Sequence, residues 1–167
     1  MDKSENKEGG RDLAKAKVKI RRPLPGDGEQ ITGIVKAITK RTPSAGFRKM
    51  VSNYLEERKD TCMVAEVDGK AVGFILGAIK EYGFGVPRTG WIEVLGVHPS
   101  RMGSGIGTRL GWKLISVFKN RGVQAVHTSV QWTSGDLLAF FRELGFTRSD
   151  FLNLELPLKG KGRRARG

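Results

Sequence analysis

Apolar residues recur along this chain with two different spacings. Where apolar and polar residues alternate, the pattern predicts a half-buried strand, and where apolar residues lie three and four apart it predicts a helix with one buried face. Strands are expected at residues 18–21, 61–67, 70–80, 91–97, 123–131 and 151–158. Helices are expected at residues 27–38, 47–58 and 108–120, with a last one capped by Ser134 or Asp136 and running to Glu143.

Turn residues mark the boundaries between these elements. Asp68-Gly69 separates two apolar runs and predicts a tight hairpin, because both residues tolerate a positive φ. Asp27 stands where it can cap the first helix. The resulting order, β-α-α-β-β-β-α-β-α-β, predicts one mixed sheet with helices on both faces. The strand–helix–strand unit over residues 91–131 predicts a parallel pair.

Length and composition indicate a single globular domain. The 167 residues are 38% hydrophobic, which is enough for a core without a disulfide or a metal. The longest apolar run, residues 71–79, is far shorter than the roughly 20 residues of a membrane-spanning helix, and the N-terminus lacks an apolar signal core. With one cysteine, Cys62, and two histidines, an internal disulfide and a structural zinc site are excluded. We therefore expect a cytoplasmic protein with no metal and no membrane partner. Cys62 is expected to be a small buried hydrophobe.

Positive charge is concentrated at the two ends of the chain. The net charge is +13; residues 1–22 hold eight Lys or Arg against four acids, and residues 159–167 hold five Lys or Arg and no acid. Because neither end has enough apolar surface to fold, we expect flexible tails at residues 1–17 and 159–167 around a folded domain at residues 18–158. Such tails either keep the protein soluble or contact nucleic acid or acidic protein. The domain itself lacks the basic and aromatic surface of a nucleic-acid-binding platform.

Three glycines at two-residue spacing, Gly103, Gly105 and Gly107, separate a predicted strand from the helix that follows. The start of a helix has unpaired N–H groups and a partial positive charge, so this turn is a candidate pyrophosphate site. The alternative is a turn that only lets the strand and the helix pack closely. The dinucleotide pattern Gly-x-Gly-x-x-Gly is incomplete, because Thr108 stands at its last position, and the Gly-Lys-Ser/Thr of nucleotide triphosphatases is absent.

Two stretches of the chain carry longer motifs. One reads Val97-His98-Pro99-Ser100-Arg101-Met102-Gly103-Ser104-Gly105-Ile106-Gly107-Thr108, and the other reads Ala139-Phe140-Phe141-Arg142-Glu143-Leu144-Gly145-Phe146. Together they resemble the acetyl-CoA signature and the late helix of the GNAT superfamily of N-acetyltransferases. The resemblance covers residues 18–158 and implies a three-layer α/β/α sandwich with a mixed, strongly twisted central sheet.

The chain departs from the family pattern at two positions. Met102 stands where the family usually has Arg or Gln, with Arg101 one residue earlier. Because the loop binds mainly through backbone amides, this change is expected to be tolerated. Phe141 stands where many members have a tyrosine that protonates the leaving thiolate, and phenylalanine has no proton to donate.

The resemblance implies a reaction. Acetyl-CoA is the expected cosubstrate, and its acetyl group is expected to pass to a primary amine by direct attack in a ternary complex. The amine belongs to a protein N-terminus, a lysine or a small molecule. The residues that the resemblance assigns to the cosubstrate are Leu95, Gly96, Val97, Arg101, Met102, Gly103, Ser104, Gly105, Ile106, Gly107, Thr108 and Ser134. Ser134 is equally suited to be a helix cap.

Glu93 is the candidate general base, because it is the sole acid in the strand before the glycine turn. The alternative for Glu93 is an exposed carboxylate paired with Arg88. The alternative for the whole chain is a non-catalytic acyl-CoA-binding module, or one tethered to nucleic acid by its tails. The oligomeric state is open and includes a homodimer. Trp91, Trp112 and Trp132 are expected to be packing anchors.

Overall fold

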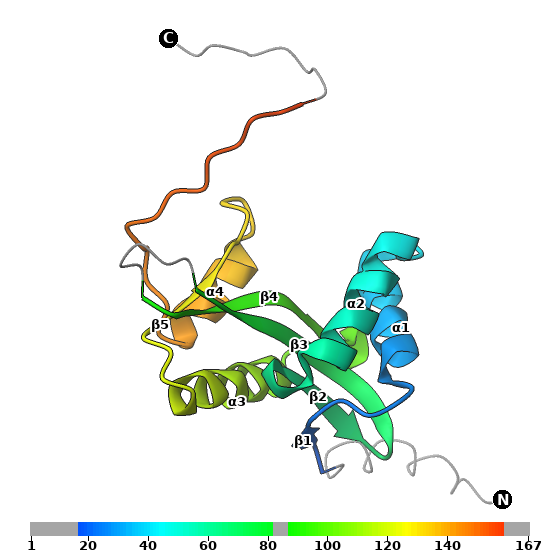
Figure 1. The fold of residues 1–167 in the computed structure, drawn as a ribbon. Helices are drawn as coiled ribbons and strands as arrows, with labels where there is room; N and C mark the ends of the chain where they lie inside the picture. Colours follow the sequence, from blue (N-terminus) through cyan, green and yellow to red (C-terminus); the bar gives the residue numbers. More distant parts are fainter. Residues whose placement is uncertain (1–16, 82–86, 159–167) are drawn as a thin grey trace, which may run out of the picture.

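Over residues 17–81 and 87–158, which the computed structural model describes, a five-stranded sheet lies between two layers of helices (Figure 1). The strands are β1 (Lys19–Arg21), β2 (Cys62–Val67), β3 (Lys70–Lys80), β4 (Thr89–Val97) and β5 (Ala125–Thr128). The helices are α1 (Asp27–Thr39), α2 (Ala45–Glu57), α3 (Ile106–Asn120) and α4 (Gly135–Glu143), with two short 3-10 turns, η1 (Lys59–Thr61) and η2 (Pro99–Arg101). Nearly all of both predicted tails, residues 1–16 and 159–167, lies outside the described residues.

The strands follow one another across the sheet in chain order, β1-β2-β3-β4-β5. The first four are antiparallel neighbours, whereas β4 and β5 are parallel and are connected through α3. This arrangement confirms the predicted mixed sheet and its parallel pair. The β4–β5 pairing stops at Ile92 and Thr128, and β4 then continues alone on that side to Val97. A gap therefore opens beside the last part of β4.

Each face of the sheet has its own apolar layer. Helices α1 and α2 cover one face, and the buried side chains there are Ile31, Ile34, Val51, Cys62, Val64, Phe74 and Leu76. Helices α3 and α4 cover the other face, and the buried side chains there are Met63, Ala65, Ile75, Ile92, Ile106, Leu110, Leu114, Phe118, Phe141 and Leu144. Cys62 is fully buried, as predicted. We refer below to the α1/α2 face and the α3/α4 face.

The tight turn between β2 and β3 is formed as predicted. Asp68 and Gly69 have φ values of 50° and 75°, and the hairpin register places Val67 opposite Lys70. Asp and Gly at these positions accept left-handed backbone at low cost. Helix α2 begins at Ala45, two residues before the predicted start, because Ser44 caps it: the Ser44 hydroxyl accepts a hydrogen bond of 3.1 Å from the Phe47 N–H.

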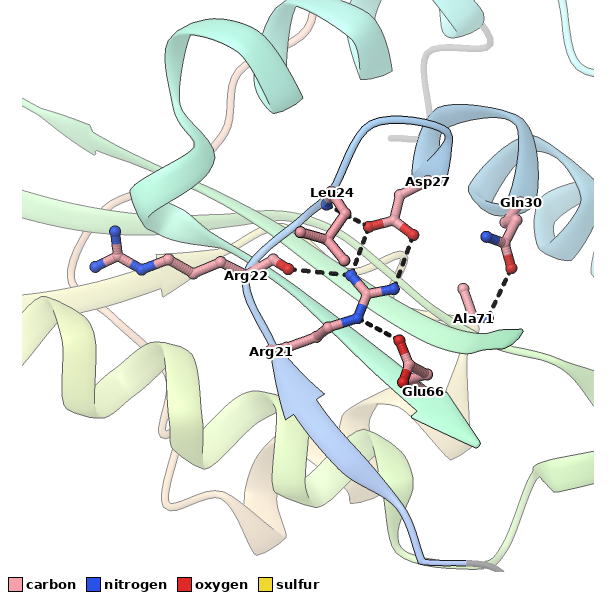
Figure 2. A network of polar contacts seen from close by, with 7 residues as sticks. All are labelled: Arg21, Arg22, Leu24, Asp27, Gln30, Glu66 and Ala71. Atoms are coloured by element: carbon pink, nitrogen blue, oxygen red, sulfur yellow. Dashed lines mark hydrogen bonds and ion pairs between the residues drawn. The ribbon is translucent and has the colours of Figure 1, made fainter. Parts of the chain in front are cut away.

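Asp27 is not the cap of α1, which corrects the prediction made for it. Gly26 precedes the helix, and Asp27 is its first residue, 1% exposed. Its carboxylate accepts hydrogen bonds of 2.7 and 3.0 Å from the Arg21 guanidinium and one of 2.6 Å from the Leu24 N–H. Arg21 also donates to Glu66 on β2, so one guanidinium joins β1, β2 and the start of α1 (Figure 2). A buried carboxylate is stable only with such partners.

The predicted last strand is wrong. Residues 151–158 form no strand, and they extend away from the body past the end of β5 (Figure 1). Alternation of apolar and polar residues indicates a strand that has a partner, but it does not reveal which strand the partner is. β5 is also shorter than the predicted 123–131. Two of the three expected tryptophan anchors are exposed, Trp112 at 52% and Trp132 at 83%.

Candidate functional site

The glycine turn between β4 and α3 is built from left-handed backbone. Gly103 and Gly105 have φ values of 76° and 77°, which side-chain-bearing residues rarely adopt. Nothing lies within 4 Å of the position where either would carry a Cβ. The backbone conformation, rather than lack of room, therefore requires glycine at these two positions. Left-handed turns that lead into a helix are suited to binding an anion through successive amides.

The N–H groups of this turn have no acceptor in the part of the chain that the structure describes. Among the described residues, none of the amides from Gly103 to Thr108 donates to a backbone or side-chain acceptor, and the first amide bonded back to the turn is that of Arg109, 3.0 Å from the Gly105 carbonyl. The first turn of α3 contains no acidic residue. Arg101 is half-buried beside the turn and forms no ion pair with any described side chain. Free donors, a helix N-terminus and a cation together suit a phosphate or pyrophosphate.

Gly107 has a different role. A Cβ there would lie 3.2 Å from a ring carbon of Phe140 on α4, so this glycine lets α3 and α4 approach each other. The glycines of the cluster therefore differ in what requires them. Gly103 and Gly105 shape the turn, and Gly107 serves packing.

The end of β4 presents backbone groups to the gap beside it. The His98 N–H donates to the Val72 carbonyl at 2.8 Å, and antiparallel partners alternate along a strand, so the N–H groups of Leu95 and Val97 point away from β3. On that side β5 has already ended. Gly96 differs from its neighbours, because a Cβ there would lie 2.7 Å from the Phe74 ring. Its missing side chain makes room for the core of the α1/α2 face.

Glu93 occupies a β-bulge in β4. Leu76 of β3 pairs with Val94 and Gly77 pairs with Ile92, so Glu93 is the extra residue between them. Bulges bend a strand and re-aim a side chain. The bend accounts for the separation of β4 from β5 beyond this point. It also explains why β5 is shorter than predicted, since its neighbour turns away.

The Glu93 carboxylate lies on the α1/α2 face beside an ammonium group. Lys80 Nζ is 2.8 Å from Glu93 Oε1 and 4.2 Å from the centre of the Trp91 ring. Both side chains of the ion pair are about one-third exposed, at 34% for Lys80 and 30% for Glu93. The alternative partner suggested by the sequence, Arg88, instead pairs with Glu81 at 2.8 Å. The sequence did not reveal Lys80, because the bulge alters which residues of β3 and β4 share a face.

Aromatic groups lie near this ion pair. Trp91 stacks on His127 of β5 with ring centres 5.3 Å apart. Burial, and then the charge of Glu93, raise the pKa of Tyr54 on α2 above its ordinary value. The open part of the α1/α2 face thus combines a carboxylate, an ammonium, a phenol and stacked rings next to the gap. This combination suits a cationic or amine-bearing molecule.

Helix α4 borders the gap from the α3/α4 face. Ser134 precedes the helix as its N-cap residue, but its side chain makes no capping hydrogen bond. Phe141 is 7% exposed and packs edge-on against Phe140 and Phe146, with ring centres 5.1 and 5.2 Å apart. It therefore fills space in the core and offers no donor, as its residue type implies.

Two features are absent from the described part of the chain. No helix there combines the length and apolarity needed to cross a membrane. No three His, Cys, Asp or Glu side chains come together there as a group that would hold a metal ion.

Residues 32–146, which include the glycine turn and α4, match the acetyltransferase (GNAT) family. The chain belongs to this family. A GNAT relative, the L-2,4-diaminobutyric acid acetyltransferase of Nocardia farcinica, is 30% identical over 122 residues, which are 73% of this chain and 61% of the relative. A mycothiol acetyltransferase of Amycolatopsis mediterranei is 30% identical over 95 residues, 55% of this chain and 32% of that protein. The chain thus spans less than two thirds of the length of either relative.

Solved structures share the GNAT fold with this chain. An aminoglycoside N-acetyltransferase in complex with CoA superimposes with a TM-score of 0.70 at 17% identity, covering 86% of this chain and 97% of its own. A transcriptional regulator from Bacillus halodurans C-125 superimposes with a TM-score of 0.71 at 20% identity, covering 85% of this chain and 100% of its own. At such identities the likeness concerns the fold alone. The GNAT fold predicted from the two motifs is confirmed.

Proposed function

We propose that this protein transfers the acetyl group of acetyl-CoA to a primary amine by direct attack in a ternary complex. The observation that carries the proposal is the set of free amides between Gly103 and Thr108, at the end of a strand whose last part has lost its β5 neighbour. These features give acetyl-CoA a continuous path. It runs from an anion site, along exposed backbone, to the carboxylate of Glu93.

The cosubstrate is proposed to bind mainly through backbone groups. The amides of residues 103–108 hold the pyrophosphate, with Arg101 nearby as a cation. Met102 is 55% exposed, so its side chain is not needed for the turn to form, and its departure from the family pattern is harmless. The outward N–H groups of Leu95 and Val97 bind the pantetheine arm and the thioester oxygen. The Ser134 hydroxyl makes no capping hydrogen bond and is a further candidate contact for the cosubstrate.

The chemistry requires a neutral amine, although a lysine-type ammonium has a pKa of about 10.4. Glu93 accepts the proton, directly or through one water, and the amine nitrogen then attacks the thioester carbon. The developing oxyanion takes a hydrogen bond from the Leu95 N–H, which lies roughly 7 Å along the strand from Glu93. The carbon–sulfur bond breaks, the nitrogen loses its second proton to water, and CoA leaves as a thiolate. Phe141 has no proton to give it, so the thiolate is protonated by water.

The acceptor is proposed to be a small molecule with a primary amine. The relatives named for diaminobutyric acid and mycothiol support this class, as do the carboxylate and rings around Lys80. A lysine side chain or a protein N-terminus has the same reactive group. A panel of all three kinds of amine therefore belongs in the test.

Release of CoA thiol in the presence of acetyl-CoA and each amine tests the proposal. We expect turnover with at least one small diamine, and a rise in melting temperature on addition of acetyl-CoA, because a ligand that binds only the native state stabilises it. A melting shift without thiol release from any amine would favour the second candidate, a non-catalytic acyl-CoA-binding module, for which the missing donor at Phe141 is the supporting feature. Salt-sensitive nucleic-acid binding that is lost on removing residues 159–167 would favour a tethered module.

A further inference from the structure

The surroundings of the Glu93 carboxylate carry more positive than negative charge. Lys80 pairs with Glu93 at 2.8 Å. The Arg58 guanidinium lies over the Tyr54 ring, 5.2 Å from its centre, and pairs with no acidic side chain within residues 17–81 and 87–158. Burial, and then the charge of Glu93, raise the pKa of Tyr54, against the opposite effect of Arg58 and Lys80. Three charged groups thus lie around one phenol, and two of them are cations.

The nearest acid along the chain does not balance this excess. Glu81 follows Lys80, but it pairs with Arg88 at 2.8 Å. The Trp91 ring holds the Lys80 ammonium 4.2 Å from its centre, and an aromatic ring attracts a cation without neutralising it. The excess positive charge therefore favours a ligand that brings a negative charge of its own.

The proposed reaction brings another cation to the same place. An acceptor amine is an ammonium at pH 7 and has to lie beside Glu93 to give up a proton. Lys80 would then share one carboxylate with a second ammonium, and such close like charges disfavour each other. A carboxylate on the acceptor removes this conflict, because Lys80 pairs with it while the acceptor ammonium lies at Glu93. The two charged groups of the pair are only 2.8 Å apart, so one small molecule can contact both.

We propose that the acceptor is a free amino acid, whose carboxylate is held by Lys80 while its primary amine lies at Glu93. Lys80 is then a specificity-determining residue, and one ion pair of the free protein becomes two in the complex. The Tyr54 phenol has a raised pKa and is protonated at neutral pH, so its O–H can donate to the same carboxylate. This inference rests on the proposed acetyl transfer at Glu93 and names the class of molecule that receives the acetyl group.

Pairs of acceptors that differ only in a carboxylate test the inference. Release of CoA thiol is measured with 2,4-diaminobutyrate, ornithine and lysine, and with the same molecules lacking the carboxyl group, 1,3-diaminopropane, putrescine and cadaverine. Each amino acid offers both an α-amine and a side-chain amine, so the comparison covers either point of attack. The wild-type protein is expected to prefer at least one amino acid over its diamine by about 10- to 100-fold in kcat/KM, the contribution of one hydrogen bond between charged groups.

Substitutions of Lys80 assign this preference to one side chain. Lys80→Met keeps the length of the side chain without its charge and is expected to abolish the preference, and Lys80→Arg is expected to restore most of it. Lys70→Met is the matched control, because Lys70 begins the same strand, is exposed and forms no ion pair with any described side chain. It is expected to keep the preference. Circular dichroism checks that all three variants fold.

Binding without turnover gives a second readout. Calorimetry on the complex with CoA, which has no acetyl group to transfer, is expected to show that Lys80→Met weakens binding of the preferred amino acid more than binding of its diamine. Equal kcat/KM for amino acids and diamines in the wild type would overturn this inference and leave acetyl transfer intact. A preference that survives in Lys80→Met would overturn it as well, because another group would hold the carboxylate. Thiol release only from peptides would contradict the amino acid class, and no release from any amine would contradict the proposed reaction itself.

Discussion

Glu93 and Lys80 form an ion pair of 2.8 Å across two neighbouring strands, at the point where β4 carries an extra residue. The ammonium of Lys80 also lies over the Trp91 ring, so this part of the α1/α2 face already binds a primary ammonium group. An acceptor amine that approaches Glu93 enters the same surroundings. Lys80 thus occupies the place beside Glu93 that the proposed amine acceptor would take.

Replacing Glu93 tests its proposed role as the base. Glu93→Gln is expected to lower kcat by about 10²- to 10⁴-fold, because a positioned base contributes that much to proton transfer. The melting shift with acetyl-CoA is expected to persist, since the contacts proposed for the cosubstrate are backbone groups of residues 95–108 and not this carboxylate. Glu81→Gln is the control, because Glu81 is 67% exposed and pairs with Arg88 instead. A Glu93→Gln enzyme with an unchanged rate and pH profile would remove Glu93 from the mechanism.

The Arg21–Asp27 pair predicts how stability changes with pH. Burial acts to raise the pKa of Asp27, but the hydrogen bonds from the Arg21 guanidinium and the Leu24 N–H outweigh it and hold this pKa below its ordinary value. Since the unfolded carboxyl titrates near pH 3.9, the stabilisation is fully present above about pH 5 and is lost as the pH falls through the lower, folded-state pKa.

Asp27→Asn is accordingly expected to lower the free energy of unfolding by about 3 kcal/mol at pH 7, the cost of breaking a buried ion pair. The difference from the wild type is expected to shrink toward pH 2, as measured by urea unfolding at both pH values. Asp60→Asn, which removes an exposed acid paired with Arg22 and Arg121, is expected to change stability little. If the difference in unfolding free energy between the two proteins were the same at pH 7 and pH 2, the lowered pKa of Asp27 would be contradicted.

A matched pair of glycine substitutions distinguishes the effect of backbone conformation from the effect of the space available to a side chain. Gly105→Ala forces a side chain onto left-handed backbone and is expected to cost about 1 kcal/mol of stability and to reduce the melting shift with acetyl-CoA. Gly33→Ala in the exposed face of α1 meets nothing within 4 Å and is expected to stabilise by about 0.4–1 kcal/mol while leaving that shift intact. Equal loss of acetyl-CoA binding in both variants would show that the turn is not the anion site.

Cys62 is expected to be unreactive toward thiol reagents in the folded protein. Burial raises the pKa of its thiol to about 11, and the side chain is 0% exposed. At pH 8 only about one molecule in 10³ would carry the reactive thiolate, even with access to the reagent. Titration with a chromogenic disulfide is expected to detect one thiol per chain in urea and none without it. Rapid labelling of the native protein would contradict this burial.

Local patterns in the sequence predicted most of the fold. The Asp68-Gly69 hairpin and the left-handed Gly103 and Gly105 follow from backbone preferences of single residues, and the buried faces of the helices follow from periodicity. Contacts between distant segments could not be predicted in this way. The Arg21–Asp27 pair is one example, because Asp27 has equally good local reasons to be a helix cap.

The site was predictable where it depends on backbone and not where it depends on side-chain register. The glycine turn was found from three residues, whereas Lys80 was missed as the partner of Glu93. A bulge shifts the pairing of two strands by one residue, and no local sequence pattern predicts its position. Residues 151–158 present the same difficulty on a larger scale, since their strand pattern does not specify a neighbour.

The bulge has one more consequence, for changes in chain length. Ile92 faces α3/α4 and Val94 faces α1/α2, so excision of Glu93 would join two residues that already alternate correctly. Loss of any other single residue between Trp91 and Val97 would move apolar side chains to the opposite face, unless Glu93 left the bulge and took the vacant place in the strand. A chain shortened by Glu93 alone should therefore keep its apolar side chains on their proper faces, while losing both the carboxylate and the bend that separates β4 from β5.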